Sequence, residues 1–87
     1  MSESMRFVAD EAMRLIRSGQ TAWGGLLSDL LNNSGHRTSY GSLYSGGRGI
    51  FTLIRTTWKR LMAMGLADQA EAVARAFVKA NGRYAYE

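Results

Sequence analysis

The sequence predicts a mainly α-helical fold, a compact four-helix domain with room for a short two-stranded β element. Apolar residues recur at helical spacing in four separate segments, and the chain contains no proline. Its ten glycines gather at the breaks between these segments. Because 87 residues are enough for one small core, we expect residues 1–87 to form a single helical domain.

The first helix is expected over residues 2–18. Asp10 and Arg14 have the i,i+4 spacing of an ion pair on its polar face. Gly19 is expected to end the helix, because glycine readily adopts the positive φ of a C′ position. The apolar face consists of Met5, Val8, Ala9, Ala12, Leu15 and Ile16.

Thr21 is a favourable N-cap for a second helix. Gly24 and Gly25 each weaken its first turn by about 1 kcal/mol relative to alanine, unless they allow another element to approach closely. Residues 32–35, Asn-Asn-Ser-Gly, are expected to end the helix. Its predicted buried stripe is Trp23, Leu26, Leu27, Leu30 and Leu31.

A long loop over residues 36–49 leads into a third helix over residues 50–64. Loops of this length in a small domain tend to be functional or disordered. Residues 37–40 have a strand-like composition, residues 42–44 fit a helical turn, and Leu43 is expected to point inward. The third helix is predicted to be the central core helix, with the apolar residues Ile50, Phe51, Leu53, Ile54, Trp58, Leu61 and Met62.

Asp68 and Glu71 have the spacing of a capping box at the start of a fourth helix, which Asn81 and Gly82 are expected to end. Glu71, Arg75 and Lys79 are spaced as an exposed i,i+4 ladder. The predicted buried face consists of Ala70, Val73, Ala74 and Phe77.

The last residues, 83–87, alternate polar and apolar side chains and fit a short strand paired with residues 37–40. With a turn at 41–44, the long helix from Ile50 and a wing at 82–86, the order of these pieces loosely resembles a winged helix-turn-helix. The resemblance implies a helix that contacts DNA.

Positive charge is concentrated in the middle of the chain. Residues 30–67 contain five basic side chains and no carboxylate, whereas the remaining residues carry six basic and seven acidic side chains. The net charge of +4 therefore comes from this middle section. Such an asymmetry suits an anionic partner, either nucleic acid or the acidic surface of a protein that handles nucleic acid.

Two features of the middle section fit an anion. Glycines 46, 47 and 49 surround Arg48 where the third helix begins, and a glycine-rich helix start attracts phosphate, although a plain glycine cap explains the same pattern. Further along, Arg48, Thr52, Arg55, Thr56 and Lys59 form one polar stripe about 17 Å long. This stripe fits a DNA groove or backbone, or is simply a solvated basic face.

Tyr40 and Tyr44, with Arg37 and Arg48 beside them, offer a second mode of contact. Aromatic residues interleaved with arginine suit base stacking on single strands, and they suit protein interfaces equally well. The candidate binding residues are therefore Arg37, Tyr40, Tyr44, Arg48, Thr52, Arg55 and Lys59.

Catalysis has little support in the sequence. The one histidine, His36, has no carboxylate near it and is expected to be a solvated loop residue. Without cysteine, a thiolate metal site is excluded, and no phosphate-binding loop or nucleophile motif is present. We expect a non-enzymatic protein without metal or cofactor. With no apolar run near 18 residues and no signal-peptide pattern, we also expect it to be cytoplasmic, with no membrane partner.

The first functional hypothesis is a small regulatory protein that binds nucleic acid through the basic helix face and the Gly/Tyr/Arg loop. The alternative is a protein-interaction module, an adaptor or a phage-type inhibitor of the anti-CRISPR kind, that occludes a partner protein. Such inhibitors are often small and lack catalytic motifs, although many are acidic DNA mimics and this chain is basic. A third hypothesis is a homo-oligomer in which exposed Phe7, Tyr84 and Tyr86 form the contact between subunits. The alternative for Phe7 is that its ring is tucked under a neighbouring helix end.

Overall fold

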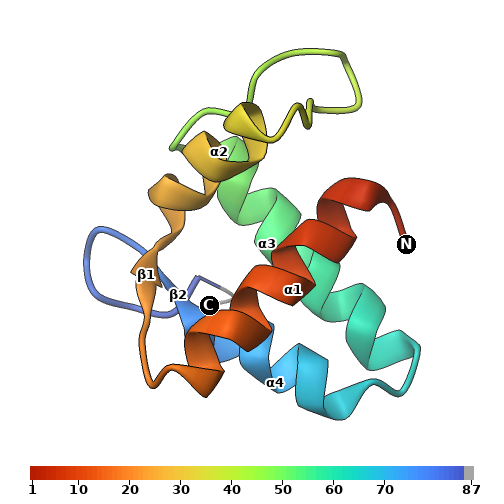
Figure 1. Cartoon of the computed structure of the whole chain (residues 1–87), viewed down its shortest axis with the longest axis vertical. Coiled ribbons are helices and arrows are strands. Elements are labelled where there is room, and N and C mark those ends of the chain that lie inside the picture. The colour runs from red at the N-terminus through yellow and green to blue at the C-terminus, as the bar shows by residue number, and fades with distance from the viewer. Residues whose placement is uncertain (86–87) are drawn as a thin grey trace.

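The computed structural model describes residues 1–85, and its four helices pack around one core (Figure 1). The mainly helical fold is therefore confirmed, together with a two-stranded element. The strands pair in parallel, with Ala22 opposite Phe77 and Trp23 opposite Val78. The elements in chain order are α1 (Glu3–Arg17), β1 (Ala22–Trp23), α2 (Gly24–Asn33), α3 (Arg48–Ala63), α4 (Ala67–Ala76) and β2 (Phe77–Val78).

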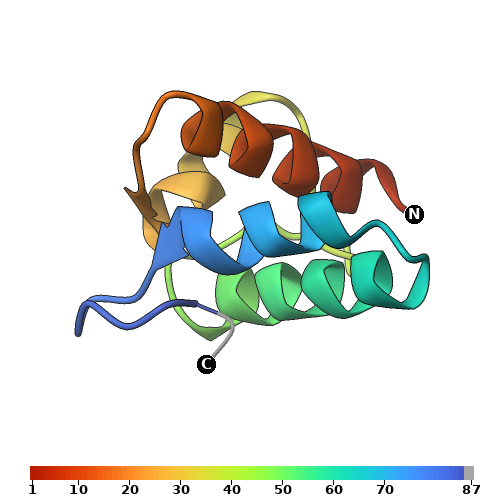
Figure 2. The ribbon, with the colours of Figure 1, turned by 90° about the horizontal axis from the view of Figure 1, so that it is seen from below.

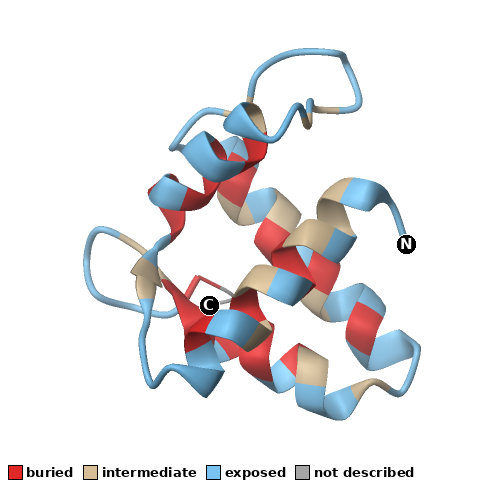
Figure 3. Ribbon diagram, in the orientation of Figure 1, coloured by how far each residue is buried: buried red, intermediate tan, exposed pale blue. Residues whose placement is uncertain are grey.

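Helix α4 lies between α1 and α3, as Figure 2 shows. Four alanines of α4 are buried, and their small side chains let the two neighbouring helices approach closely. The buried faces of all four helices turn toward this centre (Figure 3). The largest fully buried apolar residues are Phe77, Leu27, Leu31, Ile50, Ile54, Leu61, Val8 and Val73.

Helix α1 follows the prediction at its ends and over most of its apolar face, but Ile16 was wrongly assigned to that face and is exposed. The Ser2 hydroxyl caps it by accepting from the Met5 N–H at 3.2 Å, and Gly19 follows its end with φ of +67°. The ion pair on its polar face is not the predicted one: Arg14 pairs with Glu11 rather than with Asp10. The hydrogen bond from Arg14 to the Glu11 carboxylate, together with its charge, raises the pKa of Arg14.

Helix α2 begins later than predicted, and Thr21 is not its cap. The chain remains extended through Ala22 and Trp23 because these residues pair with β2, so the helix starts at Gly24. Its buried face carries Gly24, Gly25, Leu27, Ser28 and Leu31. The predicted stripe was wrong for Trp23, Leu26 and Leu30, which are 46%, 49% and 42% exposed.

The two glycines at the start of α2 serve close packing, as one of the two alternatives predicted. A Cβ on Gly24 would lie 2.5 Å from Cε1 of Phe51 in α3. A Cβ on Gly25 would lie 2.4 Å from Cζ2 of Trp23. Both distances are far below van der Waals contact, so these two rings occupy the space where side chains would stand.

Helix α3 belongs to the core as predicted, with Ile50, Ile54 and Leu61 fully buried, but the helix that lies between two others is α4 and not α3. Thr57 is also buried, because its hydroxyl donates to the Leu53 carbonyl at 2.7 Å and so leaves no unpaired polar group. Met62 was wrongly assigned to the core and is 55% exposed.

Helix α4 opens and closes differently from the prediction. It begins at Ala67 without a side-chain cap, so Asp68 and Glu71 form no capping box, and it ends at Ala76, well before Asn81. The ion pair Glu71–Arg75 of the predicted ladder is present, but Lys79 lies beyond the end of the helix. All four residues of the predicted buried face are buried, although Phe77 belongs to β2 rather than to the helix.

The C-terminal segment folds back on β2. The Lys79 N–H donates to the Arg83 carbonyl at 2.7 Å, and Tyr84 forms an antiparallel bridge with Val78. The predicted pairing with residues 37–40 was therefore wrong, since those residues form a turn. The winged-helix resemblance required a strand over residues 37–40, and no strand forms in that segment. Residues 86 and 87, the end of the predicted strand and wing, lie outside the described part of the chain.

We expect Gly24→Ala to lower the free energy of unfolding by about 1–3 kcal/mol, because the new methyl group overlaps the Phe51 ring and forces it to move. Gly49→Ala is the matched control in the first turn of α3, where nothing lies within 4 Å of the new Cβ. It should stabilise the protein by about 0.5–1 kcal/mol through helix propensity. Urea denaturation measures both changes, and equal effects of the two variants would contradict this packing.

Candidate functional site

The loop between α2 and α3 is held by side chains of α2. The Asn32 amide donates to the Tyr44 carbonyl at 2.9 Å and accepts from the Tyr44 N–H at 2.8 Å. The buried Ser28 hydroxyl donates to the Ser45 carbonyl at 2.8 Å. These three hydrogen bonds give the second half of the loop a defined position although it has no regular secondary structure.

The first half of the loop is a compact turn. The Thr38 N–H donates to the Ser42 carbonyl at 2.8 Å, and the Ser42 N–H donates to the Thr38 hydroxyl at 3.1 Å. These bonds replace the strand and the helical turn predicted here. The turn places Tyr40 at its tip, where the side chain is 95% exposed.

Leu43 does not point inward as predicted but is 62% exposed. Tyr44 takes the inward position, half-buried and packed against the core. The two bonds from Asn32 to the Tyr44 backbone account for the difference, because they fix which side of the chain faces α2.

Arg37 has a structural role as well as a charge. Its Nη1 donates to the Asn32 carbonyl at 3.1 Å and to the His36 carbonyl at 2.7 Å. The Asn32 carbonyl also accepts from the Gly35 N–H at 3.1 Å, so Arg37 adds a second donor at the end of α2, where its charge offsets the negative end of the helix dipole. Arg37 therefore helps to hold the loop against α2.

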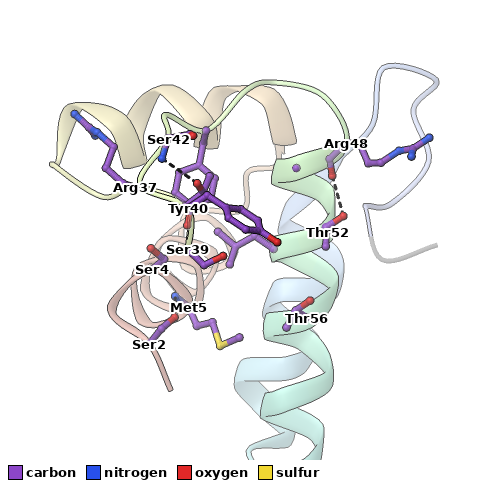
Figure 4. Close-up of a pocket in the computed structure, with 14 residues that line it drawn as sticks. Ser2, Ser4, Met5, Arg37, Ser39, Tyr40, Ser42, Arg48, Thr52 and Thr56 are labelled. Atoms are coloured by element: carbon purple, nitrogen blue, oxygen red, sulfur yellow. Dashed lines mark hydrogen bonds between the residues drawn. The ribbon is translucent and has the colours of Figure 1, made fainter.

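A groove of about 760 Å³ lies between the start of α1, the loop and the first turns of α3. Figure 4 shows Met5 of α1 and Thr56 of α3 facing each other across it. None of the described residues that line the groove is a carboxylate. The lining residues are Ser2, Ser4, Met5, Arg37, Thr38, Ser39, Tyr40, Ser42, Tyr44, Arg48, Gly49, Thr52, Leu53 and Thr56.

The groove brings together five of the seven predicted binding residues. Arg37, Tyr40 and Tyr44 come from the loop, and Arg48 and Thr52 from α3. Arg37 and Arg48 stand at opposite ends with their guanidinium groups directed away from the space between them (Figure 4). Arg55 and Lys59 do not line the groove and lie further along α3.

The outer face of α3 carries a row of exposed side chains, which we call the cationic strip: Arg48, Thr52, Arg55, Thr56 and Lys59. Helix α3 contains no acidic residue. Within residues 1–85, neither Arg48 nor Lys59 forms an ion pair, and Glu71 is engaged by Arg75. The Thr52 hydroxyl donates to the Arg48 carbonyl at 3.0 Å (Figure 4), so its oxygen retains acceptor capacity.

The sequence did not reveal that the start of α1 forms one wall of the groove. Ser2, Ser4 and Met5 are distant in sequence from the loop, and no local pattern encodes which helix end meets it. One partial signal existed in Phe7, an aromatic residue among polar ones. Its ring is half-buried and lies 5.1 Å from the His36 ring, centroid to centroid, which agrees with the tucked alternative and brings α1 beside the loop.

No protein-family model matches the chain, and no curated protein or solved structure shows significant similarity to it. Within residues 1–85, none of the helices combines the length and apolar character needed to cross a bilayer. The same residues contain no group of three or more histidines and carboxylates placed to hold a metal ion.

We expect Asn32→Ala to cost about 1–3 kcal/mol of stability, because it removes the side-chain partner of both the N–H and the carbonyl of Tyr44. Asn33→Ala is the matched control, since the neighbouring side chain is exposed at the end of α2. Hydrogen exchange at the Tyr44 amide should accelerate only in the first variant. Unchanged protection of that amide would show that Asn32 does not hold the loop.

Proposed function

We propose that this protein is a non-enzymatic, regulatory nucleic-acid-binding protein that uses the cationic strip and the adjoining loop. The observation that carries the proposal is the strip itself, a solvent-facing row of cations on a helix with no acidic residue. A phosphate backbone is the extended anion that such a row matches best. Arg37, Tyr40 and Tyr44 supply the contacts from the loop.

The spacing of the strip supports contact with several phosphates at once. From Arg48 to Lys59 the axis of α3 rises about 17 Å, which is long enough to follow a nucleic-acid backbone over several nucleotides. Arginine binds phosphate through paired N–H groups, and lysine acts as a point charge. Thr52 and Thr56, between the cations, are short enough not to hold the helix away from the backbone.

The lining of the groove supports binding rather than catalysis. The polar side-chain groups of its described lining residues are hydroxyls and two guanidiniums, with no carboxylate or histidine among them to transfer protons. His36 lies outside it, beside the ring of Phe7.

A protein-interaction module, either an adaptor or an inhibitor that occludes its partner, is the alternative function. It is favoured by a different surface, the exposed apolar side chains of Trp23, Leu26 and Leu30 at β1 and α2. Pull-downs with the double variant Arg48→Gln/Lys59→Gln and with Leu26→Glu separate the two functions. A stoichiometric protein partner that resists nuclease, survives the charge variant and is lost with Leu26→Glu would favour the alternative.

The proposed function predicts that binding to 20-nucleotide duplexes and single strands weakens steeply with salt, because each neutralised phosphate releases counterions. Arg48→Gln/Lys59→Gln should weaken binding and reduce the slope of log K against log salt by about 1.8 on duplex, or about 1.4 on a single strand. Fluorescence anisotropy at several salt concentrations measures both quantities.

Arg6→Gln/Arg17→Gln is the matched control for this measurement. It makes the same change in net charge on exposed positions of α1. If both double variants reduce affinity and salt slope equally, the protein attracts nucleic acid only through its total charge. If the native protein binds neither duplex nor single strand at low salt, the proposed function is wrong.

A further inference from the structure

We infer that the groove between α1, the loop and α3 holds an unpaired base, so that the preferred ligand is single-stranded nucleic acid. This inference rests on the proposed function and names the form of nucleic acid that the site takes. A base in the groove is flanked by phosphates that run toward the cationic strip. Paired bases inside a duplex are stacked and cannot enter such a groove.

The walls of the groove match the two kinds of surface that a base presents. Leu53 and Tyr44, both packed against the core, give the lining apolar surface that suits the base faces, and Met5 adds more from α1. Hydroxyl groups of Ser4, Ser39 and Thr56 stand on the lining. A hydroxyl both donates and accepts, so these groups suit base edges, which carry donors and acceptors side by side.

The charges around the groove are arranged for phosphates outside it. Arg37 and Arg48 stand at its two ends with their guanidiniums turned outward (Figure 4), where the phosphates on either side of a bound base would lie. Among residues 1–85, no carboxylate lines the groove, so none of the described side chains there repels the phosphates. This charge complementarity favours a nucleic-acid strand over an uncharged apolar ligand.

Tyr40 is the side chain that this ligand explains best. Its ring is 95% exposed at the tip of a turn that hydrogen bonds hold in shape. A ring in this position makes little contribution to the fold, whereas a base stacked on it would cover one face of the ring and one face of the base. Tyr40 lines the same groove as Leu53 and Tyr44, so a base held there is within its reach.

The experiment measures the affinity of native protein and variants for fluorescent 12-mers: a single-stranded DNA, the same strand as a duplex, a single-stranded RNA, and an abasic single strand with the same number of phosphates. We expect the single strands to bind more tightly than the duplex. Tyr40→Ala should weaken single-strand binding by roughly ten-fold or more, and Tyr40→Phe should retain it, because stacking needs the ring and not the hydroxyl.

Leu43→Ala is the matched control, since Leu43 is an exposed residue of the same loop that does not line the groove. The abasic strand should bind native protein about as weakly as Tyr40→Ala binds the normal strand, and Tyr40→Ala should not weaken it further. The DNA and RNA arms identify which single strand is preferred, and either preference agrees with the inference.

The inference is overturned if duplex and single strand bind equally, if Tyr40→Ala has no more effect than Leu43→Ala, or if the abasic strand binds as tightly as the normal one. In each of these cases the salt dependence through the cationic strip still stands, so the proposed function survives. Absence of binding to every oligonucleotide at low salt overturns both.

Discussion

Three hydrogen bonds from α2 to the following loop hold the surface that we propose as the binding site. Asn32 bonds both backbone groups of Tyr44, and Ser28 bonds the carbonyl of Ser45. The loop has no regular secondary structure, so these bonds, together with the packing of Tyr44 against the core, define the path of its second half. Because they fix the residues just before α3, they decide both where the groove lies and where the first cation of the strip, Arg48, is presented.

The packing of α2 on α3 supports the same surface from below. Gly24 lets the Phe51 ring come against the start of α2, and this contact lies one turn into α3. Helix α3 is thereby fixed by its apolar face, with Ile50, Ile54 and Leu61 fully buried, which leaves its other face to solvent. Because one face of α3 is held by the core, the helix can carry four cations on its other residues without a carboxylate of its own. These cations are Arg48, Arg55, Lys59 and Arg60.

Local signals in the sequence predicted local structure well. The Ser2 cap, Gly19 and the apolar spacing of α1 are contained within one segment, and the stripe of exposed residues on α3 follows from helical periodicity alone. Features that depend on distant partners could not be predicted in this way. Trp23 is exposed because β1 pairs with β2 from the other end of the chain. Tyr44 rather than Leu43 points inward because Asn32 bonds the Tyr44 backbone. The α1 wall of the groove could not be predicted for the same reason, because nothing in the sequence around Ser4 and Met5 indicates that they lie beside the loop.

The central claim is that one surface, made by the loop and the outer face of α3, receives a nucleic-acid strand. Titration of ¹⁵N-labelled protein with a short single-stranded oligonucleotide, followed by amide chemical shifts, tests this claim most directly. We predict that the shifts move in residues 37–44 and 48–59 and at the start of α1, while those of α4 stay in place. Movement centred on Trp23, Leu26 and Leu30, or on α4, would contradict the account, as would a spectrum that does not change.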